Sequence, residues 1–132
     1  MKTRAVSKPL SRNYLRKAEE YSNAMNNEFS NQRWNSCVLN AIHCGISAAD
    51  ALTIFFKGVR HAGERHEEVI NLLQTLDLDK NILGNKTKQL LGLLDVKNSA
   101  EYEEKLTNES GALTAVKNAE RFFSWVKEVL KE

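Results

Sequence analysis

One stretch of the chain decides its fold, namely WNSCVLNAIHCGISAADALTIFF at residues 34–56. Apolar side chains run from Trp34 through Ile42 to Phe56 and cover most of the helical circumference. A surface helix buries a single apolar stripe, whereas a helix that is apolar almost all round belongs inside a bundle. The sequence therefore predicts a buried central helix over residues 34–56.

The polar residues that remain in this stretch share one side of the helix. They follow one another at steps of four, three, four and three, the spacing of residues on one helical face. We call this row the polar stripe, and its members are Ser36, Asn40, His43, Ser47 and Asp50. Periodicity alone favours a solvent-facing edge, with a polar cleft or a subunit interface as the alternatives.

The rest of the chain also has a helical period and no strand signal. Apolar residues at steps of three and four predict an amphipathic helix at residues 11–31. Further predicted segments are a loop at 57–65, a short helix at 69–76, a helix at 82–96, a short polar helix or turn at 98–105, and a last helix that begins near Thr107–Ser110, where hydroxyls offer a cap. The predicted fold class is all-α, an antiparallel up-and-down bundle of four main helices plus one or two short ones.

Length and charge predict one domain with a basic start. The 132 residues suit a single domain, which we assign to residues 11–132, after a flexible basic N-terminus at residues 1–10. The net charge of +2 is too small to indicate nucleic acid. Six cations nevertheless precede the first acidic residue, Glu19, and they are Lys2, Arg4, Lys8, Arg12, Arg16 and Lys17. A frayed, solvated end is the preferred interpretation, and a phosphate-steering arm is the alternative.

Cysteines and motifs exclude several classes of protein. Cys37 and Cys44 lie two turns apart on a predicted helix, too far for a disulfide, which predicts a reduced, cytoplasmic protein. With His43 they do not complete a metal site, so we expect no metal and no cofactor. We also expect no membrane segment, because charged or amide residues interrupt every apolar run. The phosphate-loop, zinc-protease and nucleophile-elbow signatures of common enzymes are absent from the sequence.

Three segments together resemble the HEPN family of helical domains. They are NAIHCGISAADAL at residues 40–52, LLGLLDVKNSAEY at residues 90–102 and AERFFSWV at residues 119–126. The resemblance implies a helical domain that forms a homodimer and is often encoded beside a nucleotidyltransferase-type protein partner. It also implies that many relatives are metal-independent ribonucleases of toxin–antitoxin or defence systems.

The ribonuclease motif of the family is altered in this chain. Those relatives carry Arg, commonly followed by Asn, and then His after four to six residues, and the matching positions here are Lys97, Asn98 and Tyr102. Lys lacks the planar fork that binds phosphate bidentately, and Tyr is a poor proton carrier at neutral pH. Ribonuclease activity at Lys97 and Tyr102 is therefore disfavoured. Arg60 and His66 fit the same spacing in the loop and form a weaker alternative.

These observations predict a HEPN-like domain that binds a nucleotide, an RNA phosphate or a partner protein without strong catalysis. The expected cleft brings Ser47 and Asp50 together with Lys97, Asn98 and Tyr102. One alternative is a ribonuclease that works through Lys97 and Tyr102 or through Arg60 and His66. The other alternative is a helical dimerisation scaffold.

Overall fold

The structure, a computed structural model, describes residues 1–65, 67–97, 100 and 104–131. The elements follow one another as β1 (Thr3–Ala5), a 3-10 helix η1 (Lys8–Leu10), α1 (Ser11–Ser30), α2 (Trp34–Lys57), β2 (Val59–His61), α3 (Glu68–Gln74), α4 (Lys80–Asp95) and α6 (Glu109–Leu130). The all-α prediction is confirmed, and the predicted helix at residues 34–56 differs from α2 by one residue.

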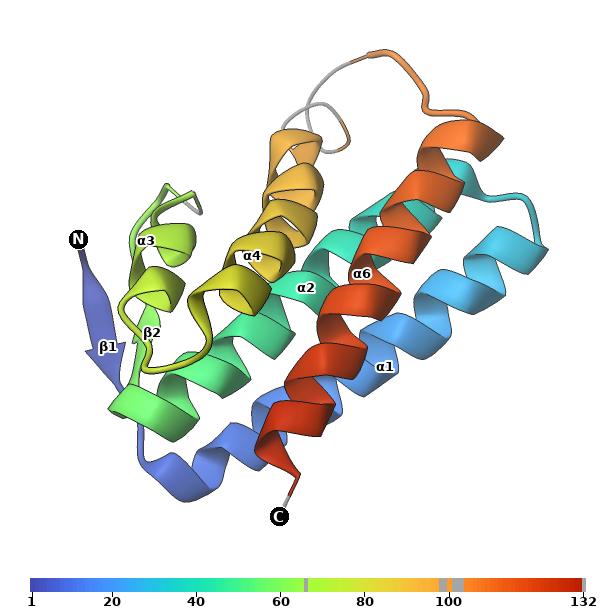
Figure 1. The fold of residues 1–132 in the computed structure, drawn as a ribbon. Helices are drawn as coiled ribbons and strands as arrows, with labels where there is room; N and C mark the ends of the chain where they lie inside the picture. Colours follow the sequence, from blue (N-terminus) through green and yellow to red (C-terminus); the bar gives the residue numbers. More distant parts are fainter. Residues whose placement is uncertain (66, 98–99, 101–103, 132) are drawn as a thin grey trace.

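The central position predicted for α2 is also confirmed. This helix packs against α1, α4 and α6, and Figure 1 shows it lying behind α6 and between α1 and α4. Its length and composition would suit a membrane span, but most of that window is buried inside the bundle, as in a core helix. The core around it includes Met25 from α1, Leu73 from α3, Leu90 from α4 and Phe122 from α6.

A glycine of α2, Gly45, allows α4 to approach closely. A Cβ atom at Gly45 would lie 2.7 Å from the Leu93 Cδ1 atom and 3.1 Å from the Leu90 Cδ1 atom. Both leucines are completely buried, so the space that Gly45 leaves is filled by α4.

A short antiparallel ribbon of β1 and β2 accompanies the helices, although the sequence carries no strand signal. Its register places Arg4 opposite Arg60 and Ala5 opposite Val59. Three-residue strands are too short to produce an alternating pattern that a sequence can reveal. Both β1 and η1 lie within residues 1–10.

Gly58 directs the chain from α2 into this ribbon. It caps α2 with a left-handed backbone, φ 67°, which glycine adopts without a steric penalty. Its carbonyl oxygen accepts a hydrogen bond of 2.9 Å from the Val6 amide. The end of α2 therefore holds the segment after β1 against the bundle.

Candidate functional site

A pocket of about 480 Å³ lies where the ribbon meets the start of α1. Its polar side chains are Arg4 from β1, Asn13, Tyr14 and Lys17 from α1, and Arg60 from β2; Ala5, Val6, Ser7 and Leu10 complete the lining. We call it the basic pocket. A volume in this range suits a small ligand.

The ribbon places two arginines of the basic pocket opposite each other. Arg4 and Arg60 are direct cross-strand partners, and such partners project from the same side of a ribbon. Like charges in this position repel one another. Arg60 donates a 3.2 Å hydrogen bond from Nη1 to the His61 carbonyl oxygen, and its buried Nε has no hydrogen-bond partner among the described residues. The site therefore concentrates positive charge that the protein only partly compensates.

Lys17 adds a third cation on the α1 side of the basic pocket. Its Nζ atom lies 4.8 Å from the centroid of the Tyr14 ring, one turn earlier in the helix. This cation–π contact keeps the ammonium group beside the aromatic face. Tyr14 thus offers a flat ring next to the charged groups.

Asp50 is the acidic group associated with these cations. Its side chain belongs to α2 and the residue is only 8% exposed. Burial raises the pKa of Asp50 to about 7, although the charges of Arg60 and Lys17 act to lower it. A carboxyl group with this pKa exchanges protons readily at neutral pH, and such groups are frequent at functional sites.

The polar stripe is not the solvent-facing edge that periodicity favoured. Ser47 and Asp50 are buried, and the remaining members are half-buried. The reason is that α1 covers this side of α2, where the Tyr21 ring stacks on the His43 ring at a centroid distance of 5.3 Å. The stripe is a partly buried polar seam whose last member is Asp50.

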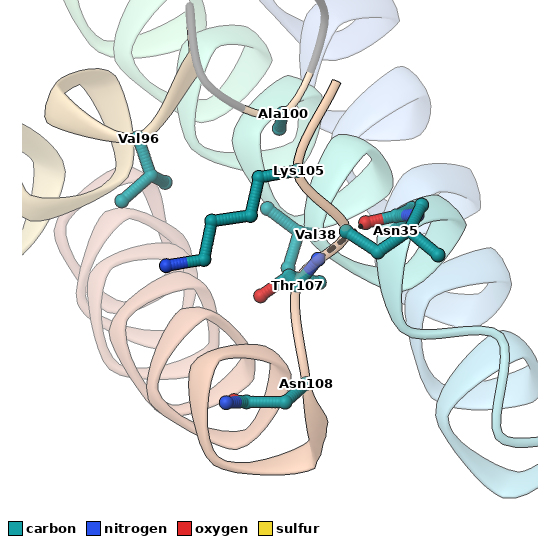
Figure 2. Close-up of a pocket in the computed structure, with 8 residues that line it drawn as sticks. Asn35, Val38, Val96, Ala100, Lys105, Thr107 and Asn108 are labelled. Atoms are coloured by element: carbon teal, nitrogen blue, oxygen red, sulfur yellow. Dashed lines mark hydrogen bonds between the residues drawn. The ribbon is translucent and has the colours of Figure 1, made fainter. Parts of the chain in front are cut away.

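A second pocket lies at the other end of α2 (Figure 2), with a volume of about 240 Å³. Its lining includes Asn35, Val38, Val96, Ala100, Lys105, Leu106, Thr107 and Asn108. The Thr107 amide donates a 2.9 Å hydrogen bond to Asn35 Oδ1, which attaches the segment before α6 to α2. Figure 2 shows the Lys105 side chain extending across this pocket.

The structure does not bring all the predicted site residues together. Lys97 is half-buried and follows Val96, which lines the second pocket together with Val38 of α2. Asp50 lies about 18 Å from Val38 along the axis of α2, at about 1.5 Å per residue. A single cleft containing both Lys97 and Asp50 is therefore not formed within the chain. Asn98, Tyr102 and His66, the other predicted site residues, lie outside the described residues.

Of the predicted site residues that the structure describes, Arg60 lines the basic pocket, and its charge acts to lower the pKa of the buried Asp50 carboxyl. Sequence reasoning did not assign Arg4, Asn13, Tyr14 or Lys17 to a site. The signal that pointed towards some of them was the run of cations before Glu19, for which a phosphate-steering arm was the alternative interpretation.

The cysteines do not contribute chemistry to either pocket. Both are buried, and burial is the main cause that raises the pKa of Cys37 to about 11 and that of Cys44 to about 12. Both thiols therefore stay protonated at neutral pH. No group of three or more metal-ligating side chains occurs among the residues that the structure describes.

Known proteins share this fold. The family model for the HEPN domain matches residues 11–129 of this chain. The solved structure of TT1696 from Thermus thermophilus is similar with a TM-score of 0.72 and 15% identity, covering 92% of this chain and 98% of that one. ST0689, an archaeal HEPN homologue, is similar with a TM-score of 0.67 and 16% identity over the same shares. No curated protein matches the chain. Since the family model spans nearly the whole helical bundle, the chain belongs to the HEPN domain family.

Proposed function

We propose that this HEPN-family chain binds a phosphate-bearing ligand, a nucleotide or an RNA phosphate, in the basic pocket. The observation that carries the proposal is the direct cross-strand pairing of Arg4 with Arg60, both of which line the pocket. Two cationic side chains at facing positions of a ribbon repel each other, and a bound anion reduces that repulsion. Lys17 adds a third cation.

The remaining side chains suit the rest of such a ligand. Arginine can hold two phosphate oxygens through its planar fork, which fixes orientation as well as charge. The Tyr14 ring offers a surface on which a base can stack. The side-chain amide of Asn13 can donate hydrogen bonds to polar ligand atoms and accept hydrogen bonds from them. The pocket thus combines charge with an aromatic platform.

Calorimetric titration with adenosine 5′-monophosphate tests this proposal. We expect Arg60→Gln to weaken binding about tenfold or more, since a charge-assisted hydrogen bond contributes roughly 1.5–3 kcal/mol. The matched control is Arg121→Gln, which removes the same charge from an exposed position on α6 and should change affinity less than about twofold. Equal effects of the two substitutions, or no binding by the wild-type protein, would contradict the proposal.

An RNA incubation in the presence of a chelator separates this proposal from the ribonuclease alternative. We expect intact RNA, because Lys97 stands where the ribonuclease relatives have Arg and lacks its bidentate fork. Cleavage that Arg60→Gln abolishes would assign catalysis to the basic pocket. Cleavage that only Lys97→Ala abolishes would place it near the second pocket instead.

A further inference from the structure

The basic pocket receives one cationic side chain from each of three separate elements. Arg4 comes from β1, Lys17 from α1 and Arg60 from β2, and all three line the same space of about 480 Å³. The ribbon thus supplies two cations and α1 supplies the third. A ligand in this pocket meets positive charge both from the ribbon and from the helix.

These cations have no carboxylate partner at the pocket. None of its lining residues that the structure describes is acidic. None of the three cations forms an ion pair with a described residue, whereas Arg16, the neighbour of Lys17, pairs with Glu20 at 3.5 Å. The buried Asp50 carboxyl, whose pKa Arg60 and Lys17 act to lower, is not a lining residue either. The pocket therefore leaves positive charge for a ligand to compensate.

Arg60 is held by its own strand in an orientation that leaves one edge of the guanidinium group without partners. Its Nη1 atom donates a 3.2 Å hydrogen bond to the His61 carbonyl oxygen. Its Nε and Nη2 atoms donate to no residue that the structure describes, and Nε is buried. The Nε and Nη2 atoms form the edge through which arginine binds two oxygens of one phosphate group. Such an acceptor would satisfy the buried Nε donor.

We infer that the basic pocket recognises a terminal phosphate group, a phosphomonoester, in preference to the phosphodiester inside a nucleic-acid chain. This inference rests on the function proposed above and names the class of its ligand. A phosphomonoester has three free oxygens and a charge of about −1.5 to −2 at neutral pH. A phosphodiester has two free oxygens and a single negative charge.

The number of free oxygens decides between the two classes. If the open edge of Arg60 binds two oxygens of a phosphate group, only a phosphomonoester has a third oxygen left for Lys17 or Arg4. Its second negative charge also offsets more of the repulsion between the facing arginines. A free nucleotide and the phosphorylated end of an RNA chain share this chemistry.

Two adenine nucleotides that differ only in the phosphate linkage test the inference. Adenosine 5′-monophosphate has a terminal phosphate, whereas adenosine 3′,5′-cyclic monophosphate has the same base in a cyclic phosphodiester. We expect wild-type protein to bind the first at least about tenfold more tightly, the effect of one further charge-assisted hydrogen bond. Calorimetric titrations at equal ionic strength near about pH 7.5, where the monoester is largely doubly charged, measure this preference.

A substitution of Lys17 tests whether the third cation causes the preference. We expect Lys17→Gln to reduce the preference for adenosine 5′-monophosphate to below about threefold, because the third oxygen loses its partner. The matched control is Arg16→Gln, which removes a cation one residue away on the same helix. Both positions are exposed, but Arg16 does not line the pocket, so this variant should keep the wild-type preference.

Short uridine oligonucleotides with and without a 5′-phosphate distinguish the two sources of a terminal phosphate. Tighter binding of the phosphorylated oligonucleotide than of adenosine 5′-monophosphate supports recognition of an RNA end, and the opposite order supports a free nucleotide.

Equal affinity of wild type for the two adenine nucleotides overturns the inference and leaves the proposed function standing. A preference that Lys17→Gln does not diminish also overturns it. Failure of every one of these ligands to bind wild type overturns both the inference and the proposed function.

Discussion

Arg4 and Arg60 lie directly opposite each other across the β1–β2 ribbon, so the protein holds two like charges together. We predict that Arg4→Gln relieves this repulsion and stabilises the ribbon by up to about 1 kcal/mol at low salt. Amide hydrogen exchange at Val6 and Ala62 measures the change, because these amides donate hydrogen bonds across the ribbon to the Gly58 and Lys2 carbonyl oxygens. The gain should shrink at high salt, where charges are screened. A less protected ribbon at low salt would show that the two side chains do not oppose each other.

Burial of Asp50 predicts a pH-dependent stability difference. Its pKa is about 7 in the folded protein and near 3.8 when unfolded, so the folded state binds the proton more tightly between these values. Protonation of Asp50 therefore stabilises the folded protein. This contribution is fully present below the pKa of the unfolded state and is lost as pH rises through the pKa of the folded state. Asp50→Asn should therefore match wild type near about pH 4 and exceed it by on the order of 2–4 kcal/mol near about pH 8. Urea denaturation at several pH values measures the difference, and a constant difference would contradict the prediction.

Gly45 and Gly84 form a matched pair for the helix contact. A Cβ at Gly45 meets the buried Leu93 side chain at 2.7 Å, whereas nothing lies within 4 Å of one at Gly84. We expect Gly45→Ala to destabilise the protein by about 1–2 kcal/mol, since overpacking outweighs the gain in helix propensity. Gly84→Ala should stabilise it by roughly 0.5–1 kcal/mol. Thermal unfolding measures the change in unfolding temperature of each variant. Changes of the same sign in the two variants would contradict the close approach of α4.

The first turn of α6 depends on Asn108. Its Oδ1 atom accepts a 2.8 Å hydrogen bond from the Gly111 amide, so the cap is an amide oxygen and not one of the hydroxyls that the sequence offered. Asn108→Ala should cost about 1 kcal/mol of stability in urea denaturation. Ser110→Ala, the control, should change stability by less than about 0.5 kcal/mol. A larger loss of stability in Ser110→Ala than in Asn108→Ala would assign the cap to the Ser110 hydroxyl instead.

The helices were predictable because their signals are local. The apolar composition around Ile42 and the period of the flanking segments mark helices without reference to distant residues. The basic pocket depends instead on Arg4 meeting Arg60, a contact between segments that α1 and α2 separate in the sequence. Periodicity likewise placed Asp50 on a polar face but could not indicate that α1 covers that face.

Strand β1 joins the rest of the molecule through a contact between segments that are distant in sequence. It pairs with β2 only after the chain has passed through all of α1 and α2. Closing so long a loop costs conformational entropy that a few ribbon hydrogen bonds repay late, whereas neighbouring helices gain contacts early. We therefore expect the bundle to form before Arg4 reaches Arg60. A ligand that engages both arginines consequently fastens the beginning of the chain to a bundle that has already folded.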